Sequence, residues 1–583
     1  MYVDDSRGDH WIFAANEAEV RERKSFVCRL EGNAIALFPD GAKIFAVDNR
    51  CPHLGFPLDR GSVQDCILTC HWHQARFDLT SGGTFDQWAD DVRAFPVRVQ
   101  NGEIWINLAE LQDPKIRHVK RLQQGLERDV SLVIAKSVVS LHHLEAPPVD
   151  AFRTGLEFGV RNRRAGWGQG LTIHTALMNI APLLDDEDRP RAMFHGIAAV
   201  SSETAGSASR FPLAPLSGSN VDFPTLKRWF RQFIQVRDSD GSERCLATAI
   251  RNGGSKSEIA EMLFSALTDH RYIQFGHPLD FTNKAFEALE YVGWEQAEKV
   301  LTCLVPGITT AGRMEEANSW RNPVDLILLL EEVFLKLPVA ILAGKSCTLP
   351  WEGKSKLVEI LMSDDPFETS EALISALSMG LPPHELAGIV AYCAALRISR
   401  FHTSNEFGDW DRALHTFTFA NAVHQGLSRT PCDELVRGVF DAAMSLYLDR
   451  FLNVPQARLI KCEGEEIGEA LLSRLQEMLN QQQQVNESGG LVSRYLDSGS
   501  STDALLACIG KLLLREDRDF HTIQMIEAAF SQFRLLRGAP EGIEILVGAV
   551  RYLSAHSPTM RSQGQTYDAA RRLQRGERIF EEK

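Results

Sequence analysis

The chain has 583 residues, of which 44% are hydrophobic and 24% are charged, so it is long enough for more than one domain of about 100–200 residues. The 62 Lys and Arg residues are outnumbered by 77 Asp and Glu residues, and the formal net charge is −15. A chain this acidic lacks the basic surface that attracts phosphate backbones, which excludes nucleic acid as a general partner.

The sequence also argues against a membrane span and a secretory signal. Its most apolar stretch, Val324–Leu337, is interrupted by charged residues, whereas a membrane-spanning helix needs about 20 largely apolar residues. Residues 1–10 are polar and contain no apolar run, unlike a signal peptide. The 11 cysteines are too sparse for a disulfide scaffold. We therefore expect a cytoplasmic protein whose cysteines are thiols or metal ligands.

Residues 1–112 contain short segments with the composition of β-strands, separated by Gly, Asp, Asn and Pro. The expected strands are Phe26–Leu30, Ala34–Phe38, Lys43–Val47, Ile67–Thr69, Val97–Val99 and Glu103–Asn107. Strands this short and this closely spaced predict a small all-β domain.

The rest of the chain has the pattern of helices. Residues 113–149 have a basic start and end near Pro147–Pro148, which predicts a linker with a connector helix. From 150 to 583, apolar residues recur at intervals of three and four, as in Ser257–Ala266. The predicted fold class is α+β multidomain, with a small all-β domain followed by a large all-α helical domain.

Two local expectations concern the helical part. The helix over Val324–Leu337 is expected to stop at Pro338, because proline lacks the backbone N–H that continues a helix. Residues Asn480–Gly490 contain four successive Gln residues and two Gly, which predicts an exposed, mobile loop.

The strongest motif is formed by Cys51 and His53, followed after sixteen residues by Cys70 and His73. Two thiolates and two imidazoles on a pair of loops suit a [2Fe–2S] cluster with two Cys on one iron and two His on the other. The same donors also suit tetrahedral zinc, although their spacing is not that of a zinc finger.

The motif and its surroundings resemble the Rieske [2Fe–2S] family over roughly residues 1–112. The resemblance includes Leu54–Gly55 after the first pair, and Phe77–Asp78 and Ser81–Gly83 after the second. It implies that Cys51 and Cys70 bind the buried iron and that His53 and His73 bind the outer iron. His71 and Cys66 do not occupy ligand positions.

Four positions differ from the high-potential members that the family contains. Where those members carry a further pair of cysteines joined as a disulfide, this chain has Phe56 and Trp72. Where they present Ser and Tyr hydroxyls to the cluster, it has Ala75 and Phe77. Because hydrogen bonds to the sulfurs help to set the potential, the resemblance implies a low-potential cluster of the oxygenase type.

A cluster that carries one electron needs an acceptor. Rieske oxygenases hold mononuclear iron on two His and one carboxylate in a β-rich domain with a His-x4-His-like signature, which this chain lacks. A site between helices is the alternative, and its candidate residues are His174, His195, His270, His277, Asp280, His402, Asp411, His415 and His424. His384, His521 and His556 lie in charged or Pro-flanked settings and are interpreted as ordinary imidazoles.

Spacing connects some of these candidates. Asp411 and His415 are four residues apart and share a helix face. No histidine has Glu three residues before it, which disfavours a diiron-carboxylate centre. Segments such as Gly276–Phe286 and Phe417–His424 are similar in texture to questin oxidase-like proteins, which favours oxidation of a bulky organic substrate.

The sequence therefore predicts a Rieske iron–sulfur oxidoreductase, as a component or single-chain form of an oxygenase or oxidase. An external reductase or ferredoxin supplies electrons, because no GxGxxG motif follows a strand. The predicted acceptor is a His-lined site that binds an organic small molecule. A second metal ion, iron, in the helical domain and assembly into a homo-oligomer are two further hypotheses. The alternative is a non-catalytic electron-transfer protein whose helical domain docks a partner enzyme.

Overall fold

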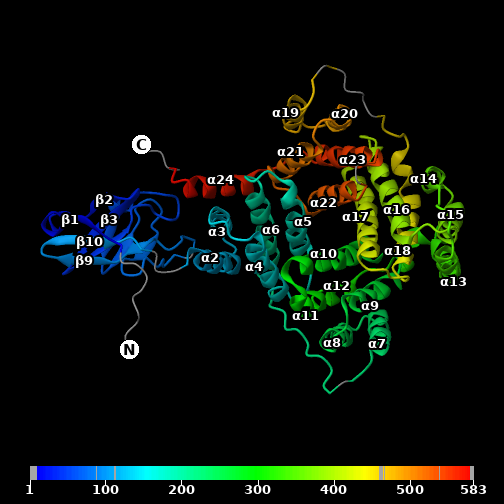
Figure 1. Ribbon diagram of the computed structural model, residues 1–583, viewed down its shortest axis with the longest axis horizontal. Coiled ribbons are helices and arrows are strands. Elements are labelled where there is room, and N and C mark those ends of the chain that lie inside the picture. The colour runs from blue at the N-terminus through cyan, green and yellow to red at the C-terminus, as the bar shows by residue number, and fades with distance from the viewer. Residues whose placement is uncertain are drawn as a thin grey trace. The chain divides into compact units, whose positions relative to one another are not determined.

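The computed structural model describes residues 10–86, 88–109, 113–218, 220–458, 464, 466–536 and 539–577. These residues form two compact units (Figure 1). The first consists of the described residues of Met1–Thr154 and Ser562–Lys583, and the second, the helical unit, of those in Gly155–Arg561. The chain therefore returns to the first unit at its C-terminal end, and we found no signal for this return in the sequence.

The β-strands of the first unit form three small antiparallel sheets. The first sheet has the order β1 (Trp11–Asn16), β10 (Glu103–Asn107), β9 (Val97–Gln100). The second has the order β2 (Phe26–Leu30), β3 (Asn33–Asp40), β4 (Lys43–Asp48), β8 (Ala94–Phe95). The third has the order β5 (Ser62–Gln64), β6 (Ile67–Thr69), β7 (Arg76–Asp78), and a short helix α1 (Glu17–Arg21) follows β1. All six expected strands are present to within two residues at each end.

Strand β3 separates two hydrophobic cores. Its residues Ile35 and Leu37 point into the core shared with β10, whereas Ala36 and Phe38 point into a second core that also contains Cys51. Successive side chains of a strand face opposite sides of the sheet, so a strand buried on both sides reads as a continuous apolar run. The loop that follows β4 therefore begins at a strand pair whose side chains are packed in a core, and Cys51 of that loop belongs to the same core.

Three helices complete the first unit: α2 (Pro114–Arg128), α3 (Ser131–His143) and α24 (Ser562–Gln574). Arg121 of α2 and Lys136 of α3 both bind Asp90, and Lys136 also donates to the carbonyl of Pro52. The C-terminal helix bonds to α3, since Ser140 donates to the Gln574 side chain at 2.9 Å. These helices are therefore attached to the loop that contains Cys51.

The remaining helices are joined by loops and short 3₁₀ turns. Helix α4 (Pro148–Arg161) leads into the helical unit, which continues with α5 (Gln169–Ile180), α6 (Arg189–Thr204), α7 (Phe223–Gln235), α8 (Ser239–Arg251), α9 (Lys256–Thr268), α10 (His277–Val292), α11 (Ala297–Thr302), α12 (Val305–Thr310), α13 (Leu326–Lys345), α14 (Lys354–Leu361), α15 (Pro366–Ser378), α16 (Pro383–Ser399), α17 (Phe407–Arg429), α18 (Val436–Leu448), α19 (Glu469–Met478), α20 (Val485–Asp497), α21 (Thr502–Leu514), α22 (Phe520–Leu535) and α23 (Glu541–Ala555). The expected fold class, a small all-β domain followed by a large helical part, is confirmed.

Four helices of this unit, α5, α10, α17 and α22, pack in a closed ring (Figure 1). Their shared interior is polar in places. Lys284 of α10 is 1% exposed and donates to Glu527 at 2.6 Å and to Glu287 at 2.9 Å. Asn179 of α5 donates to the same two carboxylates at 2.7 and 2.8 Å. The buried charges are thus paired and hydrogen-bonded, as burial requires.

Two local expectations were wrong. Helix α13 continues through Pro338 to Lys345, because the buried stripe that includes Leu337 and Ile341 extends across the proline and outweighs the lost hydrogen bond. The expected loop after Asn480 gives way to helix α20 at Val485. There Gly489 is buried, and a Cβ on it would lie 2.9 Å from Arg551, so it permits close packing of helices.

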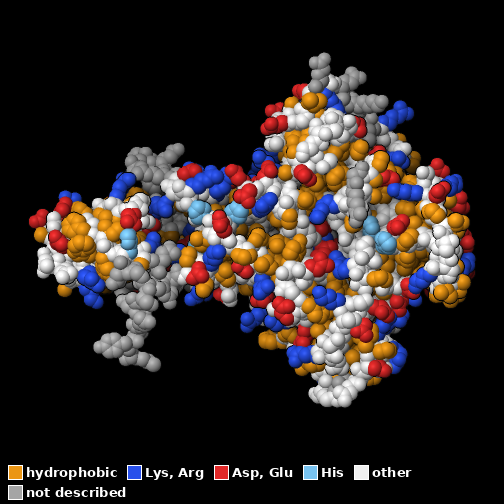
Figure 2. All heavy atoms as spheres, viewed as in Figure 1, with side chains coloured by type: hydrophobic (Ala, Val, Ile, Leu, Met, Phe, Trp, Pro, Cys, Tyr) orange, Lys and Arg blue, Asp and Glu red, His pale blue; other side chains and the backbone are white. Residues whose placement is uncertain are grey.

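The described helices include none that is both long and apolar enough to cross a membrane. On the face seen in Figure 2, Lys and Arg side chains are interspersed with Asp and Glu side chains. This face is therefore mixed in charge, although the chain as a whole is acidic.

The buried lysine yields a prediction about stability. Lys284→Met leaves the buried carboxylate of Glu527 without the cation it pairs with, and Glu287 keeps Arg429 at 3.8 Å. We therefore expect the helical unit to lose about 3–5 kcal/mol of unfolding free energy. Lys336→Met is the control, because Lys336 forms an exposed pair with Glu371, for which the loss is about 0–1 kcal/mol. Urea unfolding followed by far-UV circular dichroism measures both variants, and equal losses would contradict the prediction.

Candidate functional site

The four residues of the Cys/His motif lie on two loops of the first unit. Cys51 and His53 lie between β4 and β5, and Cys70 and His73 lie between β6 and β7. Because β6 pairs directly with β7, the second loop is the tip of a hairpin, and β5 pairs with the other edge of β6. The first loop leaves the sheet whose strand β3 is buried on both faces.

The two loops have the same turn geometry. In each, the cysteine N–H donates to the carbonyl five residues later, at 2.7 Å for Cys51 and 2.8 Å for Cys70. The cysteine carbonyl accepts from the N–H four residues later, at 2.7 and 2.9 Å. That fourth residue is Gly55 in one loop and Gln74 in the other, with φ of 84° and 65°. A matched pair of turns therefore presents the donors.

The sulfur and nitrogen donors lie at different depths. Cys51 and Cys70 are 2% and 1% exposed, whereas His53 is half-buried and His73 is exposed. The two imidazole rings meet edge to face with their centroids 4.8 Å apart. The thiols thus face the core and the imidazoles face outward, as a cluster with one inner and one outer iron requires.

The electrostatics of the donors suit metal binding. The hydrogen bond between the two thiols lowers the pKa of Cys70 to about 6 and raises the pKa of Cys51. Burial lowers the pKa of His53 to about 4, so its ring is neutral at pH 7. The Nδ1 atom of His53 is buried and has no hydrogen-bond partner among the described residues. Such a lone pair is available to a metal.

Comparison with known proteins identifies this domain. Residues 10–96 match the family model of the Rieske [2Fe-2S] domain. Over 104 residues the chain is 33% identical to the 3-phenylpropionate/cinnamic acid dioxygenase ferredoxin subunit of Escherichia coli (strain K12), and the match covers 17% of the chain and 96% of that subunit. The chain belongs to the Rieske [2Fe–2S] family.

Two further known proteins match a segment of the same length, 17% of this chain. The chain is 32% identical over 111 residues to 4beta-methylsterol monooxygenase from Methylococcus capsulatus, which covers 17% of this chain and only 30% of that enzyme. A solved structure, the ferredoxin of carbazole 1,9a-dioxygenase from Nocardioides aromaticivorans, is 24% identical with a TM-score of 0.16, and the match covers 17% of this chain and 96% of that one.

Membership of the family decides between the two metals left open by the sequence, in favour of the [2Fe–2S] cluster over zinc. The buried thiols of the two cysteines, the adjacent rings of the two histidines and the neutral ring of His53 fit that cluster. They support Cys51 and Cys70 as ligands of the inner iron and His53 and His73 as ligands of the outer iron. His71, by contrast, lies within 3.0 Å of the Ser62 hydroxyl.

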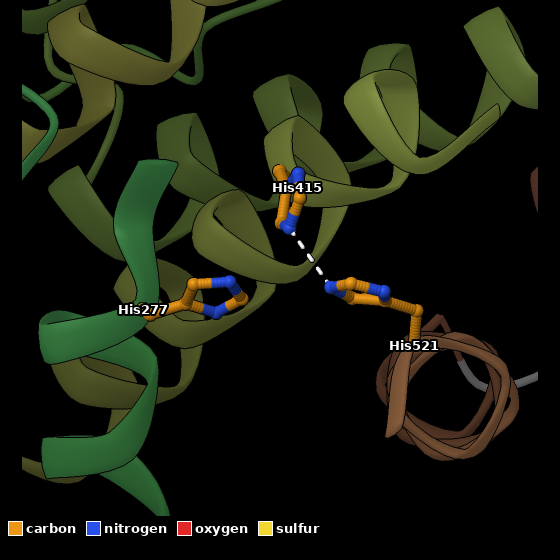
Figure 3. A group of neighbouring side chains, drawn as sticks. All are labelled: His277, His415 and His521. Atoms are coloured by element: carbon orange, nitrogen blue, oxygen red, sulfur yellow. Dashed lines mark hydrogen bonds between the residues drawn. The ribbon is translucent and has the colours of Figure 1, made fainter. Parts of the chain in front are cut away.

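A second group of donors lies in the helical unit. His277 of α10, His415 of α17 and His521 of α22 have ring nitrogens that all lie within 4.8 Å of one another (Figure 3). The Nε2 atoms of His415 and His521 are 3.1 Å apart. We call these three residues the histidine triad. The structure thus brings together two of the candidates, His277 and His415, with one histidine that sequence reasoning set aside.

Aromatic rings surround the histidine triad. Phe275 stacks on His415 with their ring centroids 5.9 Å apart, and Phe281 stacks on His277 with their ring centroids 5.5 Å apart. Burial lowers the pKa of His277 to about 4 and that of His415 to about 3. Both rings are therefore neutral at pH 7 and keep a lone pair for a ligand.

Asp411, also a candidate, lies beside the histidine triad. Its Oδ2 atom is 3.7 Å from Nδ1 of His521, and its Oδ1 atom accepts from the Tyr552 hydroxyl at 2.6 Å. Burial and the nearby Asp411 raise the pKa of Tyr552, so the phenol stays protonated and remains a donor. The Tyr552 hydroxyl therefore holds the Asp411 carboxylate beside the ring of His521.

The other candidates lie apart from this group, and polar neighbours occupy several of them. His270 is 2.7 Å from Glu315, and His424 is 3.0 Å from Gln532. His402 is half-buried and 2.7 Å from Ser404. Asp280 accepts from Gln524, and burial raises its pKa to about 7.

Two buried histidines remain. The ring of His174 is enclosed by Gly155 and Gly196, since a Cβ on either would lie 2.6 or 2.8 Å from a ring nitrogen. Burial lowers the pKa of His195 on α6 to about 4. Neither residue belongs to the metal-ligating group that the described residues contain.

A cavity of about 750 Å³ lies near the histidine triad. Its lining includes His556, whose Nε2 is 4.0 Å from Asp411, and the aromatic residues Phe407 and Trp410. Amide and hydroxyl side chains make up much of the rest, namely Thr403, Asn405, Gln482, Gln483, Asn486, Thr522, Ser557 and Thr559. Charged residues line it as well, namely Glu487, Asp517, Arg518 and Asp519, and its volume lies within the range of small-molecule sites.

Sequence reasoning set His521 aside because Arg518 and Asp519 precede it, a charged setting typical of an ordinary surface imidazole. A usable signal was present, however. Helix α22 buries Gln524 and Glu527 on the face that follows His521, and α10 buries Asp280 and Lys284 after His277 in the same way. Buried polar residues repeated at helical spacing mark a polar interior rather than a solvated face.

Removal of one cysteine tests the cluster ligands. Cys70→Ser removes an inner ligand, so the purified chain is expected to lack the visible absorption and reduced-state paramagnetic signal of the cluster. Cys66→Ser is the matched control, because Cys66 bonds to Asp40 and lies outside the motif. A Cys66→Ser variant without the cluster, or a Cys70→Ser variant that keeps it, would contradict the ligand assignment.

The low-potential hypothesis is tested by adding a hydroxyl. We expect a midpoint in the lower part of the Rieske range, which spans about −150 to +300 mV. Ala75 is fully buried in the same core as both cysteines, and Ala75→Ser is expected to raise the midpoint by donating to a cluster sulfur. Ala36→Ser in the same core is the control. A wild-type midpoint well above about 0 mV in a redox titration would reject the hypothesis.

Proposed function

We propose that the chain is a Rieske oxidoreductase that delivers single electrons to an acceptor, a metal ion or the substrate, held at the histidine triad. In this proposal an external reductase or ferredoxin reduces the [2Fe–2S] cluster, and an organic small molecule is oxidised or oxygenated in the helical unit. The observation that carries the proposal is the presence, in one chain, of a Rieske donor set and a separate group of three clustered histidines, of which burial keeps His277 and His415 neutral.

The relatives support the oxidative part of this proposal. One is named as the ferredoxin subunit of a dioxygenase and another as a monooxygenase. A Rieske domain in both settings serves a reaction that consumes electrons at another site. We infer the same division of labour here, with the acceptor in the helical unit rather than in a partner.

The cluster, when bound, supplies one electron at a time, and the protein determines where that electron leaves. His73 is exposed, whereas both cysteines are buried. The outward imidazole of His73, with His53 at its edge, is therefore the exit that we propose. Transfer follows within one chain or between subunits of a homo-oligomer.

The helical unit supports binding of an organic substrate. The cavity beside Asp411 has a volume of about 750 Å³, which lies within the range of small-molecule sites, about 300–1,000 Å³. Phe407 and Trp410 offer ring faces, while its amide and hydroxyl groups offer hydrogen bonds.

We place the reaction in the cytoplasm, whose reducing conditions keep cysteines as thiols.

Electron delivery is tested by reoxidation of the cluster. The full-length chain is reduced anaerobically, freed of reductant and mixed with oxygenated buffer in a stopped-flow instrument. We expect the wild-type cluster to reoxidise faster than that of His277→Ala, because the variant lacks one residue of the acceptor site. His384→Ala, which removes an exposed histidine at the start of α16, is the control. Equal rates in all three proteins would reject the relay.

A second function is favoured by one observation. The match to the dioxygenase ferredoxin subunit covers 96% of that protein, so a Rieske domain of this size is sufficient as a separate electron carrier. In this alternative the chain is non-catalytic and its helical unit docks a partner enzyme. Reoxidation that requires a second protein, and that is unchanged in His277→Ala, would favour it.

A further inference from the structure

We propose that the histidine triad binds one divalent transition-metal ion through His277, His415 and His521, with Asp411 as the residue that positions His521. This inference deepens the proposed function, on which it rests for the role of the metal as electron acceptor. The binding itself depends only on the geometry of the helical unit.

The first argument is convergence. The three rings come from three different helices of the closed ring, α10, α17 and α22, and point toward one another (Figure 3). Two imidazole nitrogens bound to one ion at about 2.0–2.1 Å lie roughly 3–3.5 Å apart. The Nε2 atoms of His415 and His521 are already 3.1 Å apart, and the remaining nitrogen lies within 4.8 Å of them. A small adjustment of the His277 ring completes a three-nitrogen face.

The second argument is the state of the rings. Burial and the neighbouring imidazoles disfavour a charge on His277 and His415, which share this space with His521. The surrounding rings of Phe275, Phe281 and Phe520 offer no hydrogen-bond acceptor for a ring N–H. Imidazole nitrogens that converge from three helices in an aromatic surrounding are suitable ligands for a metal ion.

The third argument is the outer contact of His521. Histidines that bind metals through one nitrogen commonly direct the other toward a carboxylate, which orients the ring and raises its basicity. Nδ1 of His521 faces Asp411 at 3.7 Å, while its Nε2 faces His415. The Tyr552 hydroxyl holds Asp411 in that position at 2.6 Å. The carboxylate also places one negative charge beside the proposed cation.

The donor set limits the metal. Imidazole suits iron, copper, nickel and zinc, whereas magnesium and calcium prefer oxygen ligands. Three ligands from the protein leave coordination positions open to a substrate or water. Asp280 and Gln524 follow His277 and His521 by three residues and bond to each other, and the buried Oε1 atom of Gln524 has no hydrogen-bond partner among the described residues.

Cobalt(II) is a suitable probe, because it distinguishes this ion from the iron of the cluster. The full-length chain with its cluster assembled is incubated anaerobically with excess Co²⁺, desalted and analysed for cobalt and iron. We expect the wild type to retain one cobalt per chain and to gain visible d–d absorption in the difference spectrum, with the iron of the cluster unchanged.

Matched variants assign the site. His415→Ala and His521→Ala are expected to lose the cobalt, while His424→Ala retains it, because His424 lies on the same helix but bonds to Gln532. Asp411→Asn keeps the shape of the side chain and is expected to weaken cobalt binding by about 10–100-fold. His415→Gln serves as a second variant if His415→Ala does not fold, as judged by circular dichroism.

Three results would overturn the metal site. These are a wild type that retains no cobalt, retention unchanged in both His415→Ala and His521→Ala, and loss of cobalt in His424→Ala as well. The proposed function fails separately: cobalt bound at the triad, together with reoxidation that is the same in wild type and His277→Ala, would leave the metal site intact and reject the relay.

Discussion

Removal of imidazole from water is the constraint on which both candidate sites depend. A buried ring loses its proton, so its pKa falls and its lone pair is released, as for His53 and for His277 and His415. Burial also lowers the pKa of His195 and His424, and His270 and His424 meet polar partners in Glu315 and Gln532. Burial therefore keeps several rings neutral, and the neighbouring donors decide which of them can share a metal.

Each site is supported by elements whose packing is fixed from more than one side. Strand β3 contributes to two hydrophobic cores and supports the cluster loops, while Lys136 binds the carbonyl of Pro52 between two cluster ligands. In the helical unit, α10, α17 and α22 pack in a closed ring with α5. Donors placed on such elements keep their mutual geometry, which metal binding and electron transfer both require.

The Rieske domain was predictable because its information is local. Its four donors lie within 23 residues, and the apolar runs of β3 and β4 are visible as short strands. The helical unit was predictable only as helices. Pro338 did not end α13, since the buried stripe continued beyond it, and Gly489 marked close packing rather than a loop. In both cases a local propensity was outweighed by contacts with distant residues.

The amino-acid sequence alone determined the small all-β domain and the helical remainder, and it singled out the cysteine and histidine pairs that we propose as cluster ligands, because neighbours along the chain carry these features. It also identified His277, His415 and Asp411 as candidates, but among several histidines of equal standing. Only the tertiary structure joined His521 to them and separated His270 and His424 from them. The reason is that helix packing, not chain order, decides which side chains from helices about 100 residues apart share one desolvated space.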